Sequence, residues 1–233
     1  MGNSVIKKLL WGGSAIAVLF FAVMMYTSFY GNPAEYFKAK AEITGYIDKN
    51  YRDVLHLEGI SYSSKMQCYI GRVTEKDDSR NKSYIAYYGN TGNIEDDYHF
   101  RARLSMEDQL RVAIATLVSA SSGIPAEKLK IDPQVEIPPF KYKMSDKYNP
   151  AEPVGLTVSI ANKYASLEEF TRDAYSIIKS LYSSNLTFTK IELYSFTPED
   201  GNKSYHTIVK EGEKISSLED VKKLAYIKSW EKK

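Results

Sequence analysis

The feature that most constrains this chain is an uncharged, apolar run near its N-terminus. Residues 9–30 contain no Asp, Glu, Lys or Arg, and as a helix rising about 1.5 Å per residue they would extend roughly 33 Å, enough to cross a bilayer core. Trp11 near one end and Tyr30 near the other fit the aromatic belts of membrane interfaces. The run predicts a transmembrane signal anchor over residues 1–31; a cleaved signal peptide, which has a shorter apolar core, is the alternative.

The charges around this run bear on orientation and on partners. Lys7 and Lys8 precede it, and Lys38, Lys40 and Lys49 follow it. The N-terminal tail is short, and long domains cross membranes largely regardless of their charge. We therefore expect a single-pass protein of the cell membrane, with a cytoplasmic N-terminus and an extracytoplasmic C-terminal body. Without Lys7 and Lys8 the body has as many basic as acidic residues, so no nucleic-acid partner is expected.

Residues 32–131 have the pattern of a first α+β subdomain. Asn32 can cap a helix over 33–50, with Pro33 in its first turn. Short apolar stretches separated by turn residues then predict four strands, at 54–61, 66–74, 83–88 and 94–104. A second helix that begins at Ser105 completes an α-β-β-β-β-α order. Several strands between two helices favour an antiparallel sheet packed against helices.

Residues 132–153 differ in composition from the rest of the chain, because they hold five of its eight prolines. Such a segment predicts a linker and the boundary between two subdomains. Residues 154–233 then follow a β-α-β-β-α order, with strands at 154–161, 186–196 and 204–210, a helix behind a capping box at Ser166, and a last helix over 218–228. The fold class predicted for the body is α+β, with two small antiparallel-sheet-plus-helix subdomains.

No motif in the sequence points to a catalytic, cofactor-binding or metal-binding site. His56, His99 and His206 lie in three different predicted strands, and none has a second His or Cys at ligand spacing. Cys68 is the single cysteine, and the sequence shows no partner that would activate its thiol as a nucleophile. We therefore predict no cofactor, no metal and no catalytic residue, and whether the body is an enzyme is left open.

Tyrosine is the most unusual part of the composition, with 19 residues. A tyrosine offers a large rigid ring with a polar tip, which suits contact with a glycan or peptide and also suits ordinary sheet packing. In the predicted strand 94–104, polar side chains alternate with apolar ones and share one face, which could meet an anionic polymer or be simply solvated. The candidate surface contacts from these two features are Tyr84, Tyr87, Tyr88, His99, Arg101 and Arg103.

The N-terminal part of the chain resembles the YfjL-like proteins. The resemblance lies in the apolar run and in the segments Gly31-Asn32-Pro33, Ala39-Lys40, Tyr46-Ile47, Tyr51 and Gly92-Asn93-Ile94-Glu95-Asp96-Asp97-Tyr98. It covers roughly residues 9–105 and is clearer in layout than in motif. It implies a single-pass, extracytoplasmic protein of a Gram-positive bacterium, and it brings no catalytic residue with it.

These observations together predict a membrane-anchored, non-catalytic binding or interaction module at the outer face of the cell membrane. Its partner would be a protein, a peptide or an envelope polymer, met by a tyrosine-bearing sheet face or by a groove between the subdomains. An envelope hydrolase whose site is assembled only in three dimensions is the alternative, and a purely structural or assembly role is a further one.

Overall fold

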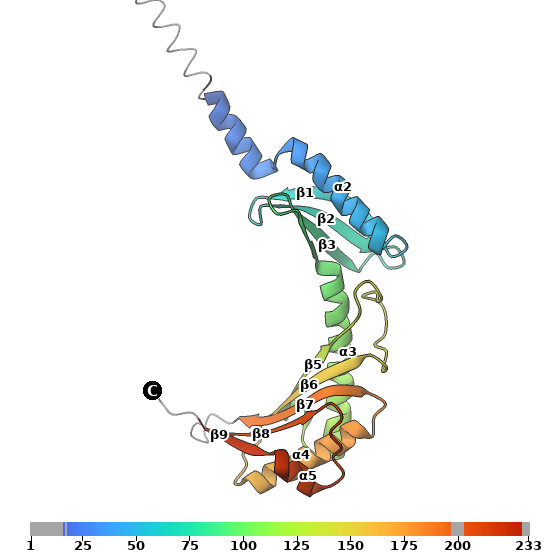
Figure 1. The fold of residues 1–233 in the computed structure, drawn as a ribbon, viewed down its shortest axis with the longest axis vertical. Helices are drawn as coiled ribbons and strands as arrows, with labels where there is room; N and C mark the ends of the chain where they lie inside the picture. Colours follow the sequence, from blue (N-terminus) through green and yellow to red (C-terminus); the bar gives the residue numbers. More distant parts are fainter. Residues whose placement is uncertain (1–15, 17, 197–202, 230–233) are drawn as a thin grey trace, which may run out of the picture. The chain divides into compact units, whose positions relative to one another are not determined.

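The computed structural model describes residues 16, 18–196 and 203–229. The chain divides into two compact units between Arg101 and Ala102, each built from one sheet and its helices (Figure 1). The α+β class is therefore confirmed. The division falls before the proline-rich segment 132–153, where the sequence predicted a linker, because the start of that segment is a strand of the second sheet. The turn at 198–201, between the strands predicted at 186–196 and 204–210, lies outside the described residues.

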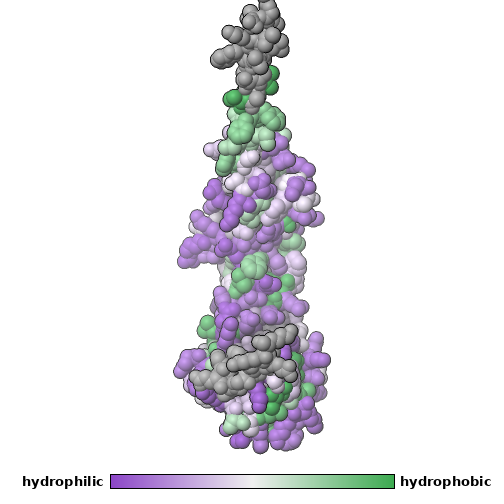
Figure 2. All heavy atoms as spheres, turned by 90° about the vertical axis from the view of Figure 1, so that its left-hand side faces the viewer, coloured by the Kyte–Doolittle hydropathy of each residue, from purple (hydrophilic) through white to green (hydrophobic). Residues whose placement is uncertain are grey.

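The prediction of an N-terminal transmembrane helix is wrong for the part of the chain that the structure describes. Residues 18–30 form a helix whose apolar side chains are exposed, and Figure 2 colours part of this end of the chain as hydrophobic. A bilayer crossing needs about 20 consecutive apolar residues in one helix. Among the described residues no helix combines that length with that hydrophobicity. The other positions of the predicted run, 9–15 and 17, lie outside the described residues.

The N-terminal unit packs one helix against one face of an antiparallel sheet. Helix α2 (Pro33–Asn50) begins as predicted, because the Asn32 side chain accepts a hydrogen bond from the amide of Ala34 at 2.9 Å. The strands β1 (Leu55–Ser63), β2 (Cys68–Glu75), β3 (Lys82–Tyr88) and β4 (Asn93–Asp96) lie side by side in sequence order. Ile43 of α2 sits so close to Gly71 of β2 that a Cβ there would lie 2.7 Å from it. The strands predicted at 54–61, 66–74 and 83–88 are confirmed as β1, β2 and β3.

The fourth predicted strand, 94–104, is wrong beyond its first residues. Strand β4 ends at Asp96, and helix α3 runs over Asp97–Ser122, eight residues before the expected start at Ser105. The apolar residues of this stretch fit both the two-residue period of a strand and the spacing of a helix. The buried ones are four positions apart, as on one face of a helix: Tyr98, Ala102 and Met106. The competition is decided at Asp96, whose Oδ1 accepts a hydrogen bond from the amide of His99 at 3.0 Å and so caps the helix.

Asp96 also joins α3 to the rest of the N-terminal unit. Its Oδ2 accepts hydrogen bonds from the hydroxyls of Tyr46, at 2.9 Å, and Tyr51, at 2.6 Å. Burial first, and then Asp96, raises the pKa of both tyrosines far above the ordinary value. Both hydroxyls therefore stay protonated and remain donors over the physiological pH range. One carboxylate thus ties together α2, the residue that follows it, the end of β4 and the start of α3.

A second carboxylate, which is fully buried, continues this network. Glu75, at the end of β2, is 2% exposed. Its Oε1 accepts a hydrogen bond from Tyr98 at 2.7 Å, and its Oε2 accepts one from the Asn81 amide at 2.9 Å. The Tyr98 ring in turn meets Tyr51 edge to face, with centroids 5.2 Å apart. Burying a carboxylate is costly unless hydrogen bonds compensate, and here Tyr98 and Asn81 supply them.

The C-terminal unit packs α3, α4 (Leu167–Tyr182) and α5 (Leu218–Leu224) against one face of a five-stranded sheet. Its strands lie in the order β5 (Leu129–Val135), β6 (Pro153–Ile160), β7 (Thr187–Phe196), β8 (Lys203–Lys210) and β9 (Tyr226–Ser229), and a short 3-10 turn, η1 (Ala126–Lys128), precedes β5. The expected strands and the helix behind Ser166 are confirmed. Two strands were missed, β5 and β9.

The sheet of this unit is mixed and not purely antiparallel as predicted. Strands β6 and β7 pair in parallel, because α4 forms the crossover that parallel neighbours require. Strand β5 was missed because Pro133 suggested a linker. β5 is an edge strand, where a proline costs no ladder hydrogen bond if its nitrogen faces outward. The final helix ends at Leu224, short of the expected 228, and its capping box is Ser217 with Asp220.

A glycine sets the junction between the N-terminal helix and α2. Gly31 has φ +78°, a conformation that side chains rarely adopt. A Cβ there would lie 2.6 Å from the Tyr69 hydroxyl and 2.8 Å from the Tyr62 ring. The same Tyr69 hydroxyl donates a hydrogen bond to the carbonyl of Asn32 at 2.7 Å. The chain is therefore held against β1 and β2 at the point where it turns into α2.

Replacing this glycine should destabilise the N-terminal unit. We expect Gly31→Ala to cost about 2–3 kcal/mol, from the left-handed backbone and the contact with Tyr69 and Tyr62. The matched control is Gly45→Ala, in an open position of α2, which should stabilise by about 0.5–1 kcal/mol through helix propensity. Urea unfolding followed by hydrogen exchange of the β2 and β3 amides measures both, and equal effects would contradict the account of Gly31.

Neutralising the carboxylate at the centre of the unit should also destabilise it. Asp96→Asn removes the charge that two tyrosine hydroxyls share, and we expect a loss of about 2–3 kcal/mol in the unfolding free energy. The control Asp53→Asn changes the same charge at an exposed position of the same unit and should be nearly neutral. Unfolding of the two variants under identical conditions checks this, and a similar small effect for both would show that Asp96 does not hold the unit together.

Candidate binding face of the first sheet

Helix α2 covers one face of the first sheet (Figure 1), and on the other face several side chains are partly or fully exposed while Cys68, Thr74 and Ala86 are buried. The pairing of the strands decides which residues lie on this other face. Across β2 and β3, Arg72 is paired with Tyr84 and Ile70 with Ala86. Across β3 and β4, Ala86 is paired with Glu95. Because side chains alternate along a strand, Tyr88 shares this face. We call Ile70, Arg72, Tyr84, Tyr88 and Glu95 the open face.

The structure separates the three candidate tyrosines. Tyr87 is 1% exposed and belongs to the core under α2, so for this residue the packing alternative holds. Tyr84 and Tyr88 lie on the open face and are partly exposed. The Tyr88 hydroxyl donates a hydrogen bond to Glu95 Oε2 at 2.8 Å, which fixes its ring across β3 and β4. Two rigid aromatic rings are thus presented on a strand in the interior of the sheet.

The candidates His99, Arg101 and Arg103 do not share one face, because they lie in a helix and not in a strand. Side chains two positions apart in a helix point in nearly opposite directions. Arg101 is ion-paired with Asp97 at 2.5 Å, and Arg103 lies 3.7 Å from Glu107. The predicted basic row therefore does not exist. His99 contributes its backbone amide to the cap at Asp96.

One of these residues does lie near the open face. Burial first, then the charges of Asp97 and Glu95, raise the pKa of Tyr84, while the nearby charge of Arg101 acts in the opposite direction. Asp97 itself is fixed by a hydrogen bond from the Ser83 hydroxyl at 2.7 Å. The first turn of α3 thus adds an acid and a base beside Tyr84, and the face is mixed in charge.

Of the remaining sequence candidates for chemistry, Cys68 lies next to Tyr88 in the first sheet and His206 lies in the second sheet. Cys68 is fully buried, and burial first raises the pKa of its thiol, which is the opposite of what a nucleophile needs. His206 is stacked between Tyr194 and Tyr226 in the second sheet. Within the described residues, no three His, Cys, Asp or Glu side chains lie close enough to hold a metal ion.

The sequence missed the other members of the open face. Ile70, Arg72 and Glu95 lie beside the two tyrosines only through the pairing of β2, β3 and β4. Register depends on long-range pairing, and a shift of one residue moves a side chain to the opposite face. The one signal available was the tyrosine-rich strand itself, which placed rings on both faces.

The hydrogen bond on the open face can be tested by titration. Glu95 holds the proton of Tyr88 and raises the pKa of that hydroxyl to about 12. The bond should therefore persist below pH about 10 and be lost as the pH rises through about 12. In ¹³Cζ-tyrosine NMR, the signal removed by Tyr88→Phe should titrate near 12 and return toward 10 in Glu95→Gln. A Tyr88 signal that titrates near 10 in the unaltered chain would contradict the bond.

Comparison with known proteins separates the two units. Residues 6–98 match the family model described as YfjL-like, N-terminal domain, and this match ends close to the division between Arg101 and Ala102. No curated protein and no solved structure matches the chain. The matched segment contains α2, the whole first sheet and the cap at Asp96. The chain thus carries a YfjL-like N-terminal domain over residues 6–98.

Proposed function

We propose that the chain is a non-catalytic interaction module and that the open face of its N-terminal unit contacts the partner. The observation that carries the proposal is the presentation of Tyr84 and Tyr88 on β3, an interior strand of the sheet, away from the face that α2 covers. Tyrosine gives a large contact area for little loss of side-chain entropy, and it is enriched where proteins bind one another.

The charges of this face favour a protein as the partner over a polymer of one sign. Arg72 and Glu95 lie on the open face, and Lys82, from the same side of β3, lies 4.0 Å from Glu58. Cations and anions are interspersed, so a uniformly charged chain would meet repulsion as well as attraction. A protein surface with complementary charges can match both signs, which gives specificity more than affinity.

The other possibilities carry no comparable support. No described cluster of titratable groups suggests hydrolysis, and the alternative of an envelope hydrolase stays a prediction. The extracytoplasmic location and the Gram-positive origin implied by the resemblance stay predictions as well.

Site-specific photo-crosslinking tests the proposal in cells that produce the protein. A benzoylphenylalanine placed at Tyr84 should give a discrete protein adduct, because this ring lies on the contact surface. The same group at Lys40, on exposed α2, is the control and should give none. Adding Arg72→Glu should reduce the Tyr84 adduct several-fold, since it reverses a charge on the contact surface.

The outcomes separate the proposal from its competitors. The proposal is wrong if positions 84 and 40 give the same adducts, or if the adduct at position 84 is insensitive to Arg72→Glu. An adduct that resists protease but is removed by glycan-degrading enzymes would identify a polymer ligand and would exclude a protein partner.

A further inference from the structure

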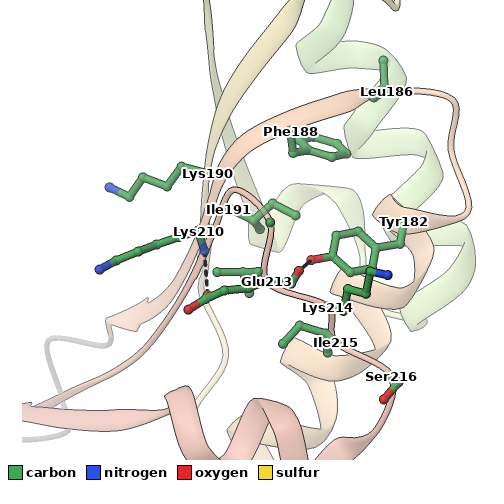
Figure 3. A pocket seen from close by; sticks show the side chains of 12 residues that line it. Tyr182, Leu186, Phe188, Lys190, Ile191, Lys210, Glu213, Lys214, Ile215 and Ser216 are labelled. Carbon is green, nitrogen blue, oxygen red and sulfur yellow. Dashed lines mark hydrogen bonds between the residues drawn. The ribbon is translucent and has the colours of Figure 1, made fainter.

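The C-terminal unit contains a pocket that the sequence did not predict. It has a volume of about 530 Å³ and lies where the end of α4, the start of β7, the end of β8 and the segment before α5 meet (Figure 3). That volume is within the range of small-molecule sites, about 300–1,000 Å³. The pocket belongs wholly to this unit and is separate from the open face.

The interior of the pocket is apolar. Phe188 and Ile191 of β7, Val209 of β8 and Ile215 line it, and Figure 3 shows Phe188, Ile191 and Ile215 gathered on one side of the strands together with Tyr182. Phe188 and Ile215 are only partly buried and extend the core of the unit. The pocket is therefore an opening into the core that a hydrocarbon chain could fill.

Two hydrogen bonds hold the segment that forms one wall. The Tyr182 hydroxyl donates to the carbonyl of Glu213 at 2.9 Å, and the Lys210 amide donates to the Glu213 carboxylate at 2.8 Å. Gly212, with φ +82°, makes the turn between β8 and this segment. The wall is thus fixed from both sides, and the carboxylate of Glu213 is turned to the backbone of Lys210 (Figure 3).

The polar lining of the pocket is mainly cationic. Three of its residues are lysines, Lys190, Lys210 and Lys214, against one glutamate, Glu213. Lys190 is ion-paired with Glu192 at 2.6 Å, and Figure 3 shows the ammonium groups of Lys190 and Lys210 directed away from the apolar side chains. Lys214 is exposed, lies beside Tyr182 in this view, and has no ion-pair partner within the described part of the chain. It is the cation that could meet a ligand at the mouth.

We propose that this pocket binds a single-chain amphiphilic anion, with its hydrocarbon chain against Phe188 and Ile191 and its acidic head at Lys214. An apolar interior alone would accept any hydrocarbon, but the excess of lysines favours an anionic head over a neutral or cationic one. A medium-chain fatty carboxylate has this chemistry. The site is independent of the proposed protein contact at the open face, so each can fail without the other.

Calorimetric titration of the full chain with decanoate, below its micelle concentration, tests this proposal. We expect saturable binding of one decanoate, an affinity about fourfold lower for each methylene removed from the chain, and weaker binding of decanol and of decyltrimethylammonium. Lys214→Glu should weaken decanoate roughly fivefold to tenfold, because it replaces attraction by repulsion, and should leave decanol unchanged. Ile215→Asp should abolish the binding of both.

Two control variants show where the ligand binds. Lys130→Glu makes the same charge change at an exposed position of β5, an edge strand that does not line the pocket. It should leave decanoate binding unchanged. Ala113→Glu blocks a second, neighbouring hollow along α3 and should also have no effect. The proposal is overturned if decanoate does not saturate, if it binds no better than decanol, or if Lys214→Glu and Lys130→Glu act alike in folded chains.

Discussion

The N-terminal unit depends on one carboxylate, that of Asp96. It caps α3 through the amide of His99 and accepts hydrogen bonds from Tyr46 and Tyr51. A partly buried carboxylate is stable only when its oxygens are satisfied, and here the satisfying groups come from α2, from the residue after it and from α3. The acidic pair before a tyrosine is therefore explained by structure: Asp96 caps α3, Tyr98 lies in the core, and Asp97 contacts Ser83 and Arg101.

The packing of α2 on the sheet also decides which side chains of the sheet are exposed. With α2 on one face, β3 sends Tyr87 into the core and leaves Tyr84 and Tyr88 on the other. The tyrosines of the unit thus have two uses, since the half-buried Tyr46 and the buried Tyr51 and Tyr98 donate hydrogen bonds to acids, while Tyr84 and Tyr88 offer contact area. The C-terminal unit differs, with a mixed sheet and an apolar pocket at the start of β7 and the end of β8.

Local signals in the sequence predicted what local physics decides. Helix α2 was placed correctly because Asn32 caps it and Pro33 fits its first turn. Long-range pairing decided the rest: β5 contains a proline that an edge strand tolerates, and the parallel pairing of β6 with β7 leaves no local mark. The stretch after Ile94 fits both the period of a strand and that of a helix, and it forms a helix because of the tertiary contacts at Asp96. Of the candidate site, Tyr84 and Tyr88 were found, whereas register alone brings Ile70 and Arg72 beside them.

A double-mutant cycle between Tyr51→Phe and Asp96→Ala tests most directly whether this carboxylate organises the unit. Unfolding free energies of the unaltered chain, both single variants and the double variant give the coupling between the two side chains. We expect a coupling of about 1–3 kcal/mol, because either single change removes the same hydrogen bond between Tyr51 and Asp96. Additive effects would contradict it and would mean that the hydrogen bond from Tyr51 to Asp96 contributes nothing to holding α2 and α3 together.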